Sequence, residues 1–351
     1  MLQTELSIAL GLSTPLISAG MAFVAGPALA AAVSNAGGLG MLGTGMAPPE
    51  GLRQMIRATR ALTNRPFGVD LIGTFTEAGH IDVLVAEKVP VAVFFWDLPS
   101  AEAVTKLRAA KIRFWMQVGR MSESEAAIAR GAEALVVQGS EAGGHNRSEA
   151  PLAQLLPRVR RAFPKVPVIA AGGIFDGAGM AAALCLGAEA VWCGTRFLAS
   201  AEANAHDGYK RAVVDAAPGG TEITRVFGPE WPGQEMRALV NKAVITARGR
   251  EAAALEESAG QIIGSVELGG NTLPVPRYSA ILPTPEFTAD LNWSCLTAGE
   301  CAAEIRSIEP AGDIVHTMTV DASRILARLS REVAPTDRLA EHGRPGTLSN
   351  F

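Results

Sequence analysis

The stretch PVIAAGGIFDGAGMAAALCLGAEAVWCGT, residues 167–195, decides the fold class of this chain. Two short apolar runs, 167–172 and 190–195, flank an alanine-rich segment at 177–186 that is long enough for a helix. Continuous apolar runs are typical of strands that are buried on both faces. Two such strands joined through a helix form a βαβ unit, so this stretch predicts a parallel sheet.

The same alternation of apolar runs and longer amphipathic segments fills the first two-thirds of the chain. The strand candidates number eight: 15–19, 39–42, 67–72, 91–95, 112–118, 134–139, 167–172 and 190–195. Each is followed by a helix candidate: 24–36, 49–61, 76–86, 100–109, 122–130, 151–162, 177–186 and 200–214. Eight strand–helix units are what a closed (β/α)8 TIM barrel needs. We therefore predict this α/β fold, with a doubly wound open sheet as the structural alternative.

The composition indicates a globular protein and argues against several kinds of partner. Of the 351 residues, 48% are hydrophobic and 19% charged, and the formal net charge is -4. No run of lysine and arginine marks a surface for nucleic acid or membrane, so neither is expected as a partner. Residues 1–15 lack the basic start of a signal peptide, and the four cysteines show no CxxC spacing. These features predict a cytoplasmic protein with reduced thiols and no metal site.

In a TIM barrel, the chemistry lies where the strands end at the C-terminal face. The residues that follow the predicted strands can be collected without choosing them for their chemistry. They are Gly20 and Met21, Asp70, Gln117, the run from Gln138 to His145, Gly172 and Gly173, and Gly194 and Thr195. We expect these residues to surround one active-site mouth.

The last two strands end in the glycine-containing turns AAGGIFDGAG and WCGTRF. Many barrels bind a phosphate at this place through backbone N–H groups, and Asp176 is positioned to cap the helix that follows. Tight strand-to-helix connections alone would also use glycine. Because two such turns come together after the last two strands, a phosphate site is predicted.

His145 is the histidine with the most suggestive position among the five in the chain, directly behind a glycine pair in QGSEAGGH, residues 138–145. An imidazole there is suited to removing a weakly acidic proton or stabilising an anion, although a capping role is the simpler alternative. Glu141 is given no catalytic role. The sequence contains no HExxH, GxSxG or Walker motif, which argues against metallohydrolases, serine hydrolases and P-loop enzymes.

Several of these motifs resemble the nitronate monooxygenase family. They are NRPFGVDL at 64–71, QGSEAGGH at 138–145 and VIAAGGIFDGAGMAAALCLGAEAVWCGTRF at 168–197. The similarity continues in EWPGQEMRALVNKA from Glu230 and in YSAILPTPEFTADLNWSCLTAGE from Tyr278.

The resemblance implies a barrel that binds FMN without a covalent bond, with the phosphate on Gly173, Gly194 and Thr195. It implies His145 as the catalytic residue. The flavin contacts that it implies are Met21, Asp70, Gln117, Gln138, Gly143, Gly173, Trp192, Cys193, Gly194 and Thr195. The implied reaction is oxidation of an alkyl nitronate by O2 to a carbonyl compound and nitrite, with an apolar mouth near Met21 and Phe23.

Two points leave room for alternatives. Many members of the family carry asparagine where this chain has Asp70, so the flavin contact at that position is in question. The EAGGH and AGGI signatures also resemble NAD(P)H-dependent FMN reductases of the enoyl-acyl-carrier-protein reductase or NADH:quinone reductase type.

The resemblance also suggests how the chain is divided. We expect an FMN-binding barrel at 1–217 and a smaller, mainly helical domain over the flavin at 218–308. A C-terminal helix that packs back on the barrel is expected at 309–335, followed by a polar tail at 336–351. The sequence leaves open whether the protein forms a homodimer.

Overall fold

The computed structural model describes residues 2–148, 150–228, 233–268 and 271–332. Its main part is an eight-stranded parallel sheet in the order β1-β9-β8-β6-β5-β4-β3-β2. The strands are β1 (Leu16–Ser18), β2 (Gly40–Gly43), β3 (Phe67–Ile72), β4 (Val91–Phe95), β5 (Arg113–Val118), β6 (Ala134–Gln138), β8 (Val168–Ala171) and β9 (Ala190–Cys193). A parallel bridge between Ile17 of β1 and Leu39, just before β2, brings the sheet's two edges together. The predicted TIM-like barrel and its eight strands are confirmed.

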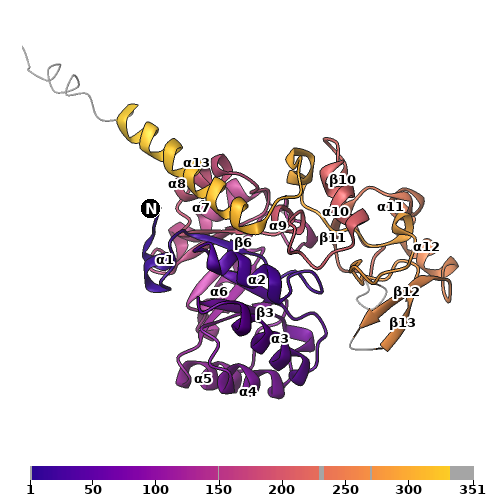
Figure 1. Cartoon of the computed structure of the whole chain (residues 1–351), viewed down its shortest axis with the longest axis horizontal. Coiled ribbons are helices and arrows are strands. Elements are labelled where there is room, and N and C mark those ends of the chain that lie inside the picture. Colours follow the sequence, from indigo (N-terminus) through magenta and orange to yellow (C-terminus); the bar gives the residue numbers. More distant parts are fainter. Residues whose placement is uncertain (1, 149, 229–232, 269–270, 333–351) are drawn as a thin grey trace, which may run out of the picture.

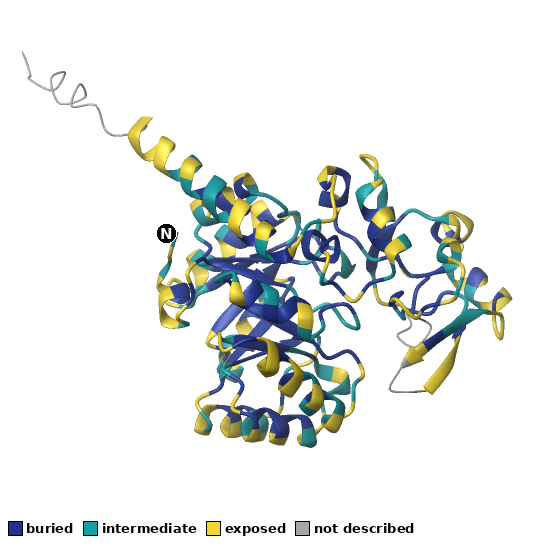
Figure 2. Ribbon diagram, viewed as in Figure 1, coloured by how far each residue is buried: buried dark blue, intermediate teal, exposed yellow. Residues whose placement is uncertain are grey.

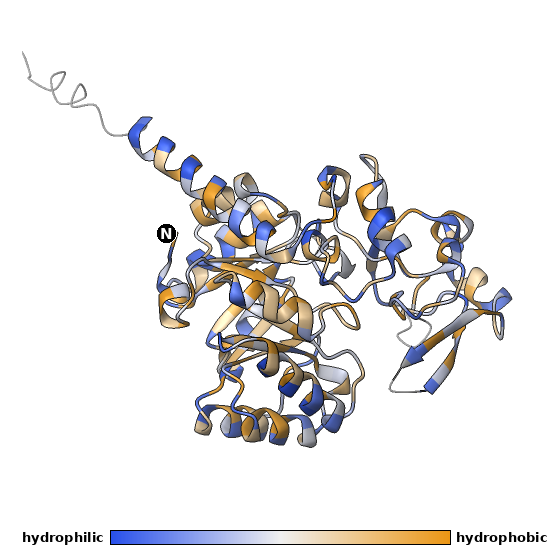
Figure 3. Cartoon of the chain, in the orientation of Figure 1, coloured by the Kyte–Doolittle hydropathy of each residue, from blue (hydrophilic) through white to orange (hydrophobic). Residues whose placement is uncertain are grey.

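The strands are apolar at nearly every position because both faces of the sheet are buried. One set of side chains fills the barrel interior, including Ile17, Met41, Val93, Trp115 and Trp192. The alternate set packs beneath the surrounding helices. Figures 2 and 3 show the result, a buried and largely apolar sheet under helices whose outer faces are exposed and polar.

The crossover helices lie close to their predicted positions. They are α2 (Pro27–Asn35), α3 (Pro49–Leu62), α4 (Ala78–Ala86), α5 (Ala101–Ala109), α6 (Met121–Arg130), α7 (Leu152–Ala162) and α8 (Gly177–Cys185). A short 3-10 turn, η1 (Gly73–Phe75), follows β3. Helix α1 (Glu5–Ala9) lies at the N-terminal end of the barrel, where Leu6 joins the interior core.

The helix predicted at 200–214 is wrong in its first half. The chain instead forms α9 (Thr195–Leu198), an irregular stretch, and α10 (Asp207–Val214). In that stretch Ser200 pairs with Glu309 in a β-bridge, and Asn204 donates a side-chain hydrogen bond to the carbonyl of Phe23 at 2.9 Å. These tertiary contacts replace the helical hydrogen bonds expected there.

Segment 218–308 lies beside the C-terminal end of the barrel (Figure 1). Its described residues form β10 (Thr221–Thr224), β11 (Met236–Leu239), α11 (Lys242–Ala247), α12 (Glu251–Glu257), β12 (Ile262–Leu268), β13 (Asn271–Pro276), η2 (Leu291–Trp293) and η3 (Glu300–Glu304). The expectation of a mainly helical segment is therefore wrong, since its described part mixes short helices with four strands. Strand β11 also pairs with β7 (Gly144–His145), which belongs to the loop after β6.

Helix α13 (Ala311–Glu332) follows this segment and packs against α8 and α2. Residues 336–351 of the predicted tail lie outside the described residues, as do Glu230, Trp231 and Pro232 of the EWPG motif. Within the described part of the chain, no helix is long and apolar enough to cross a membrane.

Candidate active site

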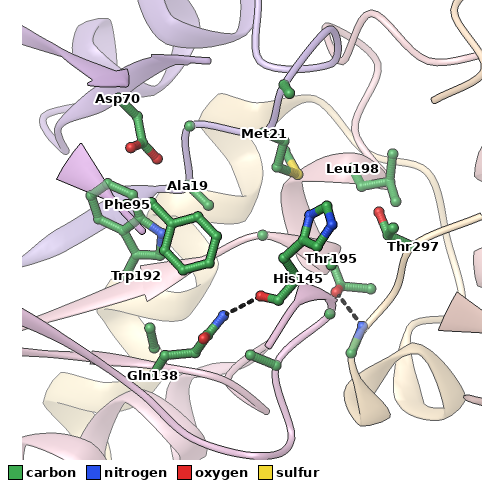
Figure 4. Close-up of a pocket in the computed structure, with 18 of the residues that line it drawn as sticks. Ala19, Met21, Asp70, Phe95, Gln138, His145, Trp192, Thr195, Leu198 and Thr297 are labelled. Carbon is green, nitrogen blue, oxygen red and sulfur yellow. Dashed lines mark hydrogen bonds between the residues drawn. The ribbon is translucent and has the colours of Figure 1, made fainter. Parts of the chain in front are cut away.

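A cavity opens at the C-terminal ends of the barrel strands and is bordered on its outer side by segment 218–308. Ten of the predicted site residues line it: Met21, Asp70, Gln117, Gln138, Gly143, His145, Gly173, Trp192, Gly194 and Thr195. Figure 4 shows several of these side chains directed toward the same space. The strand-end argument thus brings these residues together, although their roles remain predictions.

Cys193 is the predicted site residue that does not line the cavity. On β9, Trp192 points into the barrel interior, so the next side chain points the other way. Cys193 accordingly packs in the core beneath the helices. Burial raises the pKa of its thiol, which keeps it protonated. The side chain of Cys193 has no route to a ligand in the cavity.

Several lining residues were not anticipated from the sequence. Phe95 ends β4, so the strand-end rule would have found it if it had been applied to that strand. Six more come from segment 218–308, and they are Met236, Ala280, Leu282, Thr297, Gly299 and Cys301. All but Cys301 lie in the family-like stretches from Glu230 and Tyr278, but the strand-end rule does not reach them, because only tertiary folding brings them to the barrel mouth.

His145 is positioned through its backbone. It pairs with Met236 across β7 and β11, and its carbonyl accepts a hydrogen bond from Nε2 of Gln138 at 3.0 Å. The other end of the same amide, Oε1 of Gln138, accepts from the N–H of Arg147 at 3.3 Å. Gln138 therefore fixes both sides of the loop that carries His145.

The imidazole of His145 packs against Trp96, with ring centroids 4.4 Å apart and the planes at 55°. Trp96 follows β4 in a left-handed backbone conformation, at φ 77, that is uncommon for a bulky residue. Burial lowers the pKa of His145 to about 4. At neutral pH the imidazole is thus uncharged and in the form that accepts a proton.

Asp70 lies on the opposite side of the cavity from this loop (Figure 4). Its neighbours on β3, Val69 and Leu71, pack under the helices, so Asp70 faces the barrel interior. Its Oδ1 atom is buried and has no hydrogen-bond partner. Burial raises the pKa of this carboxyl well above its usual value.

The two predicted phosphate turns also border the cavity. Gly172 and Gly173 have φ values of 115 and 71, a conformation that other residues rarely adopt. Asp176 caps α8, with its Oδ1 accepting from the N–H of Gly179 at 2.8 Å. The hydroxyl of Thr195 accepts from the N–H of Gly299 at 2.9 Å. The turns thus present backbone to the cavity at the position where barrels bind phosphate.

The fold and the cavity together define a TIM barrel with a largely apolar pocket at its C-terminal face, where enzymes of this fold place their chemistry. The sequence matches the family described as Nitronate monooxygenase over residues 4–78 and 73–321. The chain belongs to this family of oxidoreductases.

Individual relatives show how wide the family is. A protein named Nitronate monooxygenase from Paraburkholderia phytofirmans is 33% identical, over 91% of this chain and 95% of the relative. A (3aS,4S,5R,7aS)-5-hydroxy-7a-methyl-1-oxo-octahydro-1H-indene-4-carboxyl-CoA dehydrogenase from Mycobacterium tuberculosis is 38% identical over 74% of each chain. The structure of FabK from Thermotoga maritima superposes with a TM-score of 0.79 and 31% identity, covering 95% of this chain and all of that one.

Members of the family are typically FMN-dependent, and the cavity residues fit this cofactor. The glycine turns leave room for a phosphate, and Gln117 lines the same cavity, where its amide would meet a ring. The orphaned Oδ1 of Asp70 also calls for a polar ligand atom. Trp192 and Phe95 supply apolar walls.

Proposed function

We propose that this protein uses FMN and O2 to oxidise alkyl nitronates to carbonyl compounds and nitrite. The observation that carries the proposal is the imidazole of His145, which packs against Trp96 at the mouth of a largely apolar cavity, where burial lowers its pKa. Gly173, Gly194 and Thr195 would hold the phosphate of FMN, and Gln117 would contact its ring. When bound, the flavin supplies the electron transfer from substrate to oxygen.

His145 has two tasks in this reaction. With a neutral nitroalkane, its uncharged imidazole accepts the proton from the carbon next to the nitro group. With a preformed nitronate, it orients the anion through a hydrogen bond. Trp96 holds the ring in place, and Gln138 fixes the backbone on both sides of it.

The rest of the cavity suits a small substrate without charged groups beyond the nitronate. Met21, Phe23, Leu198 and Leu282 line it, and among the described lining residues there is no lysine or arginine. Apolar walls exclude water and strengthen the hydrogen bonds made inside.

A second candidate is an NAD(P)H-dependent FMN reductase of the enoyl-acyl-carrier-protein reductase or quinone reductase type. It is favoured by the likeness to FabK, which covers the whole of that chain, and by the similarity to a CoA dehydrogenase. The cavity would serve both activities, because each needs the same flavin-binding barrel.

Anaerobic stopped-flow distinguishes the two functions. The purified protein is mixed separately with propyl-2-nitronate and with NADH or NADPH, and flavin absorbance is followed. A response to nitronate without reduction by nicotinamide supports the monooxygenase. Rapid reduction by nicotinamide with no response to nitronate assigns the reductase, and a protein that binds no FMN contradicts both.

The role of His145 is tested by His145→Ala, with His316→Ala as the control because His316 is exposed on α13. Loss of a general base reduces turnover of neutral nitroalkanes by about 100- to 10,000-fold, whereas FMN content is expected to stay unchanged. Unchanged turnover in His145→Ala with FMN still bound would show that this histidine is structural.

A further inference from the structure

We propose that Asp70 is a neutral carboxylic acid that donates a hydrogen bond to an acceptor atom of the ring bound in the cavity. The choice of ring rests on the proposed function, in which FMN occupies this space. The protonation state of Asp70 does not depend on that choice. It follows from the packing, the missing partner and the missing counter-charge around this residue.

The packing leaves the Asp70 side chain only one direction to turn. Its backbone lies between Gly43 of β2 and Val93 of β4. Behind it, a Cβ added at Gly20 would lie only 2.1 Å from the Cβ of Asp70, so the side chain sits directly against the backbone of Gly20. The remaining open side is the cavity that Asp70 lines.

The two donors of Thr44, the residue that follows β2, are already used elsewhere. The backbone N–H and the hydroxyl of Thr44 both donate to the carbonyl oxygen of Asp70, at 3.2 and 3.0 Å, not to its carboxyl. Oδ1 therefore stays buried without a partner. Buried polar atoms are almost always hydrogen-bonded, so an orphaned oxygen that borders a cavity points to a ligand atom as its partner.

Among the residues that the structure describes at the cavity, none carries a positive charge that would compensate an ionised carboxylate at this position. The neighbouring strands β2 and β4 read GMLG and VAVFF, without a charged residue. The other titratable side chains at the cavity are His145, which is uncharged at neutral pH, and Cys301, whose pKa is raised by burial to about 11. An isolated carboxylate would be costly here, whereas the acid form is not.

The acid form changes what Asp70 offers to a ligand. A carboxylate can only accept hydrogen bonds, while a protonated carboxyl has one O–H to donate. The isoalloxazine ring carries carbonyl oxygens and ring nitrogens that accept. As the pH rises past the pKa of Asp70, the ring loses this donor and meets a buried negative charge, so affinity for FMN falls.

The first test measures the dissociation constant of FMN by flavin fluorescence from about pH 5 to about pH 9. Asp70→Asn keeps a donor of the same shape that cannot ionise, and Asp215→Asn makes the same change at an exposed position. In the unaltered protein and in Asp215→Asn, the constant is expected to rise by up to about tenfold per pH unit above the pKa of Asp70. In Asp70→Asn this rise is absent, while titration of the FMN phosphate is shared by all three proteins.

The second test needs no flavin and measures thermal unfolding of the flavin-free full chain over the same pH range. A carboxyl whose pKa is raised in the folded state binds more protons there than in the unfolded chain. Its contribution to stability therefore declines as pH rises from about 4 toward the folded pKa. Asp70→Asn does not show this decline, because its amide cannot ionise. The difference between its Tm and that of the unaltered protein is therefore expected to become more positive as pH rises.

Parallel pH curves for the unaltered protein and Asp70→Asn in both tests would overturn the proposal. So would a Tm for Asp70→Asn that falls below that of the unaltered protein toward neutral pH, because this would show a stabilised carboxylate. If none of the proteins binds FMN, the proposed function and the ring as acceptor both fail. The unfolding test then still decides whether Asp70 is neutral.

Discussion

His145 shows how the surroundings of one residue decide its chemistry. An ordinary histidine titrates near pH 6.5 and would be partly charged in the cell. Burial at the barrel mouth, where the ring packs against Trp96, lowers its pKa to about 4, so the imidazole is neutral near pH 7. Burial on the other side of the cavity raises the pKa of Asp70. The two shifts have opposite signs because burial disfavours the charged form, which is the protonated form of histidine but the deprotonated form of a carboxyl.

The pH dependence of nitroalkane turnover follows from this shift. We expect kcat/KM to be level through neutral pH and to fall as pH drops through about 4, where His145 becomes protonated. Trp96→Ala exposes the imidazole to water and is expected to move this acid limb upward, toward the ordinary histidine pKa. Steady-state kinetics over the acid range check both curves, and an acid limb near pH 6.5 in the unaltered protein would contradict the burial argument.

Gln138 and Gln117 both face the cavity but are expected to act differently. Replacing Gln138 by alanine removes both hydrogen bonds to the backbone of the His145 loop, at a cost of about 1 to 3 kcal/mol for each buried group left unpaired. Hydrogen exchange of residues 144–147 is therefore expected to accelerate in Gln138→Ala. Gln117→Ala is the matched control, which should weaken FMN binding and leave exchange unchanged. Equal exchange in the two variants would show that Gln138 does not hold the loop.

At the scale of elements, the short pair of β7 and β11 joins the barrel to segment 218–308. Arg237 of β11 reinforces the connection, since its guanidinium donates to the carbonyl of Ser140 at 3.0 Å and pairs with Glu300 at 2.9 Å. One element thus reaches both the loop after β6 and the start of η3. This connection places residues of segment 218–308 over the strand ends.

Substitutions at two adjacent glycines in the loop after β6 test how closely this loop must approach segment 218–308. A Cβ at Gly143 would lie 2.4 Å from backbone atoms of Ala298 and Gly299, so Gly143→Ala is expected to push the 298–299 loop away from the cavity. FMN affinity should then fall by about tenfold or more, which corresponds to about 1.4 kcal/mol.

Gly144→Ala is the matched comparison, because a Cβ there meets no atom within 4 Å but the backbone has φ 75. It is expected to lower stability by about 1 to 2 kcal/mol through backbone strain, with little change in FMN affinity. Thermal unfolding and FMN titration of both variants measure these effects. If Gly143→Ala binds FMN normally, the close approach is not needed for the cavity.

At the scale of the whole molecule, α13 completes the layer of helices around the barrel. It returns from segment 218–308 to lie along α8 and α2, as Figure 1 shows. The approach to α8 is close, because a Cβ at Gly177 would lie 2.5 Å from the Cβ of Asp321. The barrel is thus covered on this side by an element from the other end of the chain.

This packing predicts that α13 contributes to the stability of the entire barrel. Met318 is 3% exposed in the core beneath the helix, and Met318→Ala is expected to lower the free energy of unfolding by about 2 to 5 kcal/mol. Leu329 is 38% exposed on the same helix, so Leu329→Ala is the control and is expected to lower the free energy of unfolding by less than about 1 kcal/mol. Urea unfolding followed by circular dichroism measures both. If Met318→Ala lowered the free energy of unfolding as little as the exposed control does, the barrel would not depend on α13.

The sequence by itself determined the eight strands and the residues at their ends, including Asp70, Gln117 and His145. These are readable because a strand buried on both faces must be apolar along its own length, and a barrel puts every strand end on one face. Tertiary structure alone decided the pairing of His145 with Met236, the place of α13 and the lining by residues such as Thr297. It also decided the burial that shifts the pKa values of Asp70 and His145. These features depend on contacts between residues far apart in the chain. Such contacts produce no repeating hydrophobic pattern in the sequence, so they cannot be predicted from it.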